Sequence, residues 1–194
     1  MNAPLQPWLT QLLPLVARAS DAVMAVYNTD FKVTQKADAS PVTEADMMAE
    51  AIITEGLRSL TPNIPVIGEE ATANGSQAAA ADTFWLIDPV DGTREFLDRN
   101  GEFTVNVALV HQGIPVFGIV FAPVTGWVFV GHSTLGAFHA DTALTWNELR
   151  ARPAVRVKGA ETSAELFSRS PLRVVASRSH NSPETEALLA HWEE

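Results

Sequence analysis

The sequence predicts an α/β fold in the form of an α+β layered sandwich, with helices packed on a largely antiparallel sheet. Two observations support this prediction. Apolar residues recur at helical spacing over residues 8–24, and a capping signal opens a second helix at residue 43. Four β-rich runs joined by turn residues then follow between residues 103 and 140, as in an antiparallel meander.

The first predicted element is a helix over residues 8–24, whose apolar residues recur every three or four positions. Its apolar face should pack on a sheet. Pro14 should start or kink this helix, because its ring removes a backbone donor and crowds the preceding turn. A short alternating run over 31–35 predicts a strand, and residues 36–41 predict a loop.

The second helix is predicted from Thr43 to about Leu60. Thr43, with Asp46 three residues later, forms the pattern of a capping box, which satisfies free amides at the start of a helix. Two roles are therefore open for Asp46. It serves the cap alone, or it also serves a functional site.

Two short apolar runs, over 64–67 and 84–87, predict strands that each stop at an acidic group. Glu69 and Glu70 follow the first run, and Asp88 follows the second. Carboxylates at the ends of strands can converge on one site. A solvated strand end is the alternative explanation of Glu69 and Glu70.

The rest of the chain predicts a loop, a meander and a final β-α unit. Residues 71–82 are small and polar, as in a surface loop. The predicted meander strands cover residues 103–110, 114–121, 126–130 and 136–140. A strand over 172–176 and a helix over 183–192 follow. We predict a helix-plus-sheet domain over 1–150 that carries the site, and over 151–194 the start of a truncated C-terminal α/β domain.

The composition limits the partners of the chain. A formal net charge of −10 repels a nucleic-acid polymer, although a small phosphate can bind if metal ions reverse the local field. The absence of cysteine excludes thiolate chemistry. No signal peptide is evident, and the most apolar segment, 114–124, falls far short of the ~20 residues that span a bilayer. The cytoplasm is the expected location, with peripheral attachment at the inner membrane as an option.

The strongest chemical signal is the run Asp88-Pro89-Val90-Asp91-Gly92-Thr93. It places two carboxylates three residues apart on a tight turn, where Gly92 allows close backbone approach. Magnesium takes a few carboxylates, keeps several waters and accepts a backbone carbonyl such as that of Val90. With Glu69 nearby, two cations could share Asp88. A turn followed by a capped helix is the alternative explanation of this spacing.

The same run could also bind phosphate. If Gly92 and Thr93 open a helix, their amides would point at a phosphate group and the helix dipole would favour its charge. The five histidines have no metal-ligand spacing, so solvated or core roles are expected for each of them.

Three motifs occur in an order that resembles the inositol monophosphatase superfamily of lithium-sensitive, magnesium-dependent phosphatases. They are Thr43-Glu44-Ala45-Asp46, Gly68-Glu69-Glu70 and the run from Trp85 to Thr93. The continuation from Arg94 to Asn106 is similar to the CysQ-type branch, the 3'(2'),5'-bisphosphate nucleotidases. Inositol monophosphatases usually carry Asn where this chain has Glu95.

The resemblance implies the αβαβα fold of the fructose-1,6-bisphosphatase and inositol monophosphatase group. It also implies that the C-terminal part is missing, because the family's Trp-Asp-x-Ala-Ala-Gly motif does not occur in this sequence. The cofactor would be magnesium, as two or three ions.

The resemblance further implies roles for individual residues. The implied metal ligands are Glu69, Asp88, Val90 and Asp91. The implied catalytic residues are Glu69, Asp46 and Thr93. The implied substrate contacts are Glu69, Val90, Asp91, Gly92 and Thr93. Thr93, with Asp46 as a relay, would orient a water for in-line attack on phosphorus, and Glu70 would stand behind the ligands or hold a third ion.

The expected reaction is hydrolysis of the 3'-phosphate of adenosine 3',5'-bisphosphate, which gives AMP and phosphate in sulfur assimilation. An inositol-1-monophosphatase-like activity is the first alternative, and a catalytically impaired metal- or phosphate-binding fragment is the second. The expected partner is a small nucleotide bisphosphate rather than a nucleic-acid polymer. A homodimer is possible, since the superfamily contains monomers and dimers.

Overall fold

The computed structural model describes residues 6–35, 41–75, 81–134, 136–140, 176–177 and 181–192. The chain divides into two units, Met1–Arg156 and Val157–Glu194. The domain boundary predicted near residue 150 lies outside the described residues, as does most of the strand predicted over 172–176.

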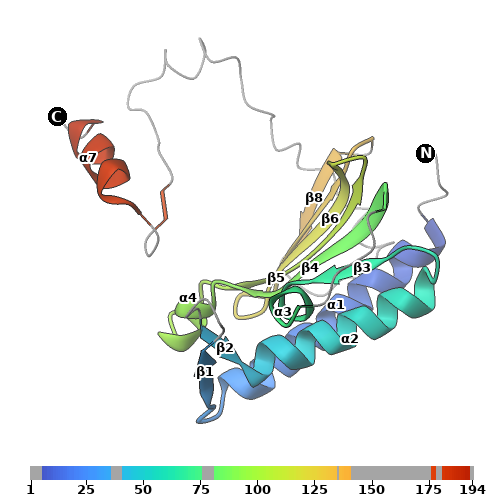
Figure 1. Ribbon diagram of the computed structural model, residues 1–194, viewed down its shortest axis with the longest axis horizontal. Coiled ribbons are helices and arrows are strands. Elements are labelled where there is room, and N and C mark those ends of the chain that lie inside the picture. The colour runs from blue at the N-terminus through green and yellow to red at the C-terminus, as the bar shows by residue number, and fades with distance from the viewer. Residues whose placement is uncertain are drawn as a thin grey trace. The chain divides into compact units, whose positions relative to one another are not determined.

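The first unit consists of helices laid on a six-stranded sheet, with a two-stranded ribbon at one end (Figure 1). Its helices are α1 (Gln6–Tyr27), α2 (Glu44–Leu60), α3 (Glu69–Ala73) and α4 (Thr93–Leu97). The ribbon pairs β1 (Val33–Gln35) with β2 (Pro41–Thr43). The sheet contains β3 (Val66–Gly68), β4 (Thr83–Asp91), β5 (Thr104–His111), β6 (Ile114–Ala122), β7 (Trp127–His132) and β8 (Gly136–Ala140) in that order.

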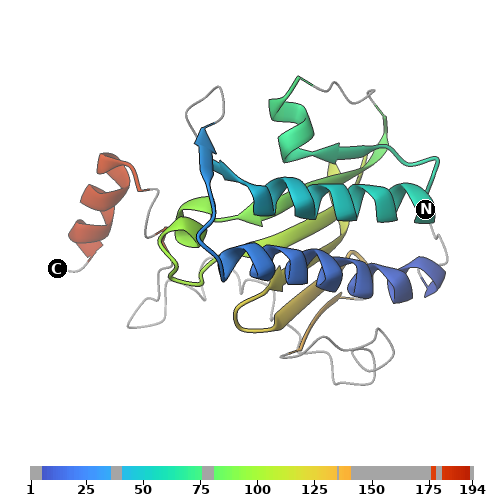
Figure 2. The same cartoon turned by 90° about the horizontal axis from the view of Figure 1, so that it is seen from below.

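Both long helices form where the sequence predicts them, and they lie side by side on one face of the sheet (Figure 2). Helix α1 runs through Pro14, which is exposed, so the expectation that Pro14 begins the helix is wrong. Helix α2 begins with the predicted capping box. The Thr43 hydroxyl accepts a hydrogen bond from the Ala45 amide at 3.2 Å, and the Asp46 carboxylate accepts one from the Thr43 amide at 2.8 Å.

The predicted antiparallel meander forms as β5 to β8. Strand β4 joins it in antiparallel to β5, and β3 is added in parallel to β4. Strand β4 is longer than expected. It continues through the acidic motif to Asp91, so the predicted tight turn is instead the irregular end of a strand. Asp88 pairs with Asn106 and Asp91 pairs with Thr104, which means that β4 carries one extra residue there. Such a β-bulge bends the strand and re-aims its side chains.

Two other segments differ from their prediction. Strand β2 begins at Pro41, within the predicted loop, because an edge strand of a ribbon tolerates a proline that donates no hydrogen bond. Helix α3 covers Glu69–Ala73, where a strand end and a loop were expected. Both acidic residues of the Gly68-Glu69-Glu70 motif therefore lie in the first turn of a helix.

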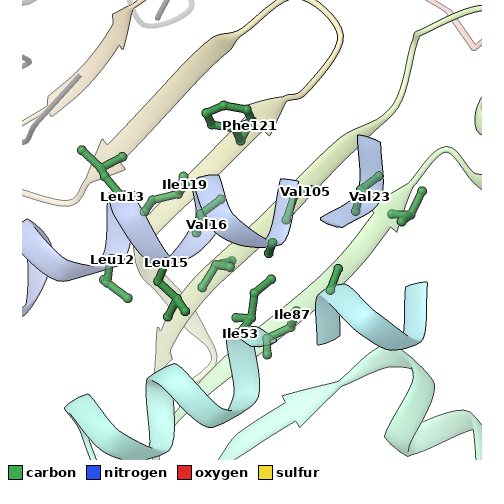
Figure 3. Close-up of a cluster of buried hydrophobic side chains, with 14 of the residues drawn as sticks. Leu12, Leu13, Leu15, Val16, Val23, Ile53, Ile87, Val105, Ile119 and Phe121 are labelled. Atoms are coloured by element: carbon green, nitrogen blue, oxygen red, sulfur yellow. The ribbon is translucent and has the colours of Figure 1, made fainter. Parts of the chain in front are cut away.

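The core lies between the two long helices and the sheet, as Figure 3 shows. Helix α1 contributes Leu12 and Val16, and α2 contributes Ile53, all fully buried. Alternate residues of the strands face them, such as Ile87 of β4 and Ile119 of β6, each 1% exposed. This packing fixes β4, and with it the acidic motif at the end of β4.

The second unit contains α7 (Pro183–Trp192), the helix predicted over the same residues. Among the residues that the structure describes, no helix combines the length and the apolar character needed to cross a bilayer.

Candidate active site

The pairing of β3 with β4 brings the first two acidic groups together. Gly68 stands opposite Ile87 in the parallel register, so Glu69 and Asp88, the next residue of each segment, are neighbours. Their side chains share a hydrogen bond. Two carboxyl groups can share a hydrogen bond only if one of them holds a proton.

Asp88 has a strongly perturbed acidity. Burial, then the negative charges of Glu69 and Asp91, and then the bond to Glu69 and the charge of Asp46 raise its pKa from 3.8 to about 8. The carboxylates of the predicted site therefore interact through space. At neutral pH without a cation, Asp88 keeps its proton. A bound divalent cation would reverse this balance by compensating the clustered negative charge.

The residues present fit a hydrated divalent cation. One carboxylate oxygen of Asp88, Oδ1, is buried and has no hydrogen-bond partner in the structure. Within the described ranges, no three acidic or histidine side chains alone form a group that could enclose a metal ion. Magnesium does not need such a cage, since it binds through one or two carboxylates and keeps several waters. Asp88, Asp91 and the Val90 carbonyl can supply this smaller donor set.

Asp91 is exposed and is held from the neighbouring strand. Its Oδ2 accepts a hydrogen bond from Asn106 Nδ2 at 2.9 Å. Asn106 lies on β5 directly opposite Asp88, so it stands beside both carboxylates of the motif. Its other amide atom, Oδ1, is buried without a hydrogen-bond partner in the structure.

The turn after Asp91 leads into α4, so Gly92 and Thr93 do open a helix, which the sequence alone left as a condition. Gly92 caps this helix with φ 94° and ψ 45°, a left-handed conformation that glycine adopts without strain. The Thr93 hydroxyl donates to the Val90 carbonyl oxygen at 3.2 Å. A carbonyl oxygen has two lone pairs, so this bond leaves Val90 able to accept a second interaction.

Asp46 is buried in the first turn of α2 and contributes to the field of the site. Its Oδ2 accepts from both the amide and the hydroxyl of Thr43, at 2.8 and 2.7 Å. The capping role is thus confirmed, and the charge of Asp46 also acts on Asp88. The relay between Thr93 and Asp46 stays a prediction.

Glu50 anchors α3, although nothing in the sequence analysis singled it out. It is buried, and its two carboxylate oxygens accept from the backbone amides of Glu70 and Ala71 at 2.7 and 2.8 Å. This contact sets the start of α3, where exposed Glu69 and buried Glu70 stand side by side. Glu50 thereby determines where Glu69 meets Asp88.

Glu50 and Asn106 are the residues that sequence reasoning missed. Glu50 follows Asp46 by four positions and lies beside Ala49 on the apolar side of α2, so its placement on the buried face was the available signal. Asn106 alternates with buried Val105 and Val107, which is what a solvent-facing strand residue also does. Only the pairing of β4 with β5 distinguishes the two cases.

The fold and the carboxylate site together identify the class of protein. The model of the inositol monophosphatase family matches residues 4–192, and the chain belongs to this family. Its members are metal-dependent phosphatases, so the predicted enzyme class is confirmed.

Within this family the chain is similar to the 3'(2'),5'-bisphosphate nucleotidases CysQ, as predicted. It is 42% identical over 184 residues to CysQ of Salmonella typhimurium, which covers 93% of this chain and 68% of that protein. The identity to CysQ of Escherichia coli K12 is 40% with the same coverage. The chain spans about two thirds of the length of these relatives.

Solved structures agree with this placement. The crystal structure of CysQ from Bacteroides thetaiotaomicron, a bacterial member of the inositol monophosphatase family, matches with a TM-score of 0.60 and 30% identity, over 94% of this chain and 67% of that one. The extragenic suppressor protein suhB from Bartonella henselae matches with a TM-score of 0.59 and 28% identity, over 66% of this chain and 50% of that one. The predicted fold class is therefore confirmed.

Proposed function

We propose that this chain is a magnesium-dependent phosphatase that releases the 3'-phosphate of adenosine 3',5'-bisphosphate, with AMP as the other product. The observation that carries the proposal is the carboxylate cluster around Asp88. The Oδ1 atom of Asp88 is buried without a hydrogen-bond partner, the pKa of Asp88 is raised, and a bound cation would compensate both. The substrate follows from the CysQ relatives, whose names specify a 3'(2'),5'-bisphosphate nucleotidase.

The proposed metal ligands are Glu69, Asp88, Asp91 and the carbonyl oxygen of Val90. Asp88 is central, because it interacts with both Glu69 and Asp91. The cation supplies Lewis-acid chemistry, which activates a water and stabilises the oxygens of an in-line displacement at phosphorus. We propose two ions, with Glu70 behind the ligands as the place where a third would be held.

The remaining residues bind and orient the phosphate. In our proposal the backbone amides of Gly92 and Thr93 donate to its oxygens, since the first amides of a helix have no partner within it. The Thr93 hydroxyl, now bonded to Val90, would turn to the attacking water and pass a proton toward Asp46. Glu69, as a metal ligand, would also take part in the activation of this water. The P–O bond to the 3'-oxygen breaks as the oxygen of water bonds to phosphorus, and the departing 3'-oxygen takes a proton from solvent water to become the 3'-hydroxyl of AMP.

The proposal is tested by phosphate release from the full chain. With Mg²⁺ and adenosine 3',5'-bisphosphate we expect turnover that chelation with EDTA abolishes. Asp88→Asn removes the ligand that both ions would share, and losing several kcal/mol of charge stabilisation corresponds to a decrease of roughly a thousandfold in kcat. Asp30→Asn is the matched control, because Asp30 is exposed between α1 and β1 and should leave activity unchanged.

Two results would contradict the proposal. A preference for inositol 1-phosphate over the nucleotide in the same assay would indicate an inositol-1-monophosphatase-like activity instead. Binding of Mg²⁺ and nucleotide without any turnover would identify a binding module instead.

We also propose a cytoplasmic location and a homodimer. Light scattering of the purified chain measures its oligomeric state directly.

A further inference from the structure

We infer that Asn106 is a positioning residue of the site, which holds the carboxylate of Asp91 and offers a buried amide oxygen beside Asp88. The inference rests on the proposed function, because Asp91 and Asp88 are proposed metal ligands. It concerns a residue of β5 that lies outside all three sequence motifs.

The pairing of β4 with β5 puts Asn106 between the two carboxylates. Asn106 is the direct cross-strand partner of Asp88, and residues opposite each other in this way share one face of the sheet. That face is opposite to the helices, since the neighbouring Val105 and Val107 are buried against the core. The bulge after Asp88 then brings Asp91 within hydrogen-bond distance of the same side chain.

The donor half of the amide fixes Asp91 without changing the charge of the site. Asn106 Nδ2 donates to Asp91 Oδ2 at 2.9 Å, which selects one orientation of an otherwise exposed carboxylate. Lysine or arginine could make a similar bond, but its positive charge would weaken the attraction for a cation. A neutral amide keeps the negative field of Asp46, Glu69, Asp88 and Asp91 intact.

The acceptor half of the amide points to a ligand. Because Nδ2 must face the carboxylate, the orientation of the amide is determined by this bond, and Oδ1 is left buried without a hydrogen-bond partner in the structure. The Oδ1 atom of the opposing Asp88 is in the same condition. Buried acceptors are nearly always satisfied by a donor, a water or an ion. Two such oxygens on facing residues are satisfied together by a hydrated cation.

The test measures binding of Mn²⁺, a spectroscopic substitute for Mg²⁺, to the full chain by electron paramagnetic resonance. Asn106→Leu keeps much of the side-chain volume and removes both donor and acceptor. Partners that orient metal ligands typically contribute ten- to a hundredfold in metal affinity, so we expect Mn²⁺ to bind ~10- to 100-fold more weakly. Asn106→Ala should show the same loss, and it cannot clash with its neighbours.

Asn100→Leu is the matched control. It also removes an amide that makes a hydrogen bond, since Asn100 Oδ1 accepts from the Glu102 backbone amide at 2.8 Å, but that bond involves no carboxylate of the site. Its Mn²⁺ affinity should equal that of the unmodified chain. Melting curves in EDTA show that each variant is folded before its affinity is compared.

The possible outcomes separate the two proposals. If the unmodified chain binds Mn²⁺ and both Asn106 variants bind it equally well, the role of Asn106 is refuted while the proposed function stands. If the unmodified chain binds no Mn²⁺, the proposed function fails, and the inference fails with it. A selective loss in the Asn106 variants supports both.

Discussion

The carboxylate of Glu50 lies against the α-carbon of Gly68, so close that a Cβ added to Gly68 would stand 2.3 Å from Glu50 Cδ. From this position Glu50 accepts hydrogen bonds from the amides of Glu70 and Ala71. The absence of a side chain at Gly68 thus lets a charge on α2 fix the start of α3. Glu69, which shares a hydrogen bond with Asp88, is the first residue of that helix.

Gly68→Ala should displace the Glu50 carboxylate and destabilise the fold. Overpacking of a filled interior costs about 1–3 kcal/mol, and the shift of α3 should also lower phosphatase activity. Thermal unfolding and phosphate release measure the two effects. Gly131→Ala is the control, because an added Cβ there meets nothing within 4 Å. Equal stability of the two variants would show that Glu50 can move aside without cost.

Glu50→Gln should be destabilising although it preserves the shape of the side chain. The amide of glutamine offers one acceptor where two backbone amides need one each, so a donor faces a donor. Leaving a buried amide unsatisfied costs about 1–3 kcal/mol. Glu55→Gln, on the exposed side of the same helix, should cost almost nothing. Urea titration of both variants gives the comparison, and a free energy of unfolding unchanged in Glu50→Gln would contradict this role.

The stability of the metal-free chain should depend on the protonation of Asp88. Its pKa of about 8 in the folded chain exceeds its ordinary value of 3.8, so between these two values the folded state binds the proton more tightly than the unfolded state. The free energy of unfolding should therefore fall as pH rises from about 4 to about 8. Asp88→Asn should remove this contribution to the slope.

The size of this effect is limited by solvent. Each unit of pKa shift corresponds to about 1.4 kcal/mol, but Asp88 is only partly buried and screening reduces the total. At pH 8 in EDTA we expect Asp88→Asn to be more stable by about 2 kcal/mol, or about 4–8 °C in melting temperature for a chain of this size. A variant that melts below the unmodified chain at pH 8 would argue against the raised pKa.

Magnesium should stabilise the chain more at high pH than at low pH. The cation and the proton compete for Asp88, so metal binding weakens as pH falls below about 8. A ligand at a hundred times its dissociation constant adds about 2.7 kcal/mol to stability, and a weaker affinity reduces that gain. Melting curves with and without Mg²⁺ at pH 6 and pH 8.5 should show the larger shift at pH 8.5, and equal shifts would exclude competition at Asp88.

The sequence predicted the structure well where the residues of a single helix or strand determine it. Periodicity located α1 and the meander, and the Thr43 and Asp46 pair located α2. The sequence predicted the structure less well where the pairing of two strands determines their length. The extension of β4 to Asp91 depends on its pairing with β5, and the apolar run over 84–87 gives no sign of it.

The residues of the candidate site likewise differ in how well the sequence predicted them. Glu69, Asp88 and Asp91 were recognisable because their motifs are local, and the structure brings their charges together. Glu50 and Asn106 act across distances of 20 and 15 residues, to Glu70 and Asp91. No spacing rule covers such a contact, since the intervening chain sets it. The residues that support a site are therefore harder to predict from one sequence than those that could hold a ligand.

The parallel pairing of β3 with β4, the one parallel pair among the described strands, also has a kinetic consequence. Strands β5 to β8 follow one another through short connections, which close early in folding, whereas the longer segment that contains α3 separates β3 from β4 and delays their pairing. We expect the meander to assemble before Glu69 arrives beside Asp88. A newly made chain would then acquire its affinity for metal as one of the last events of its maturation.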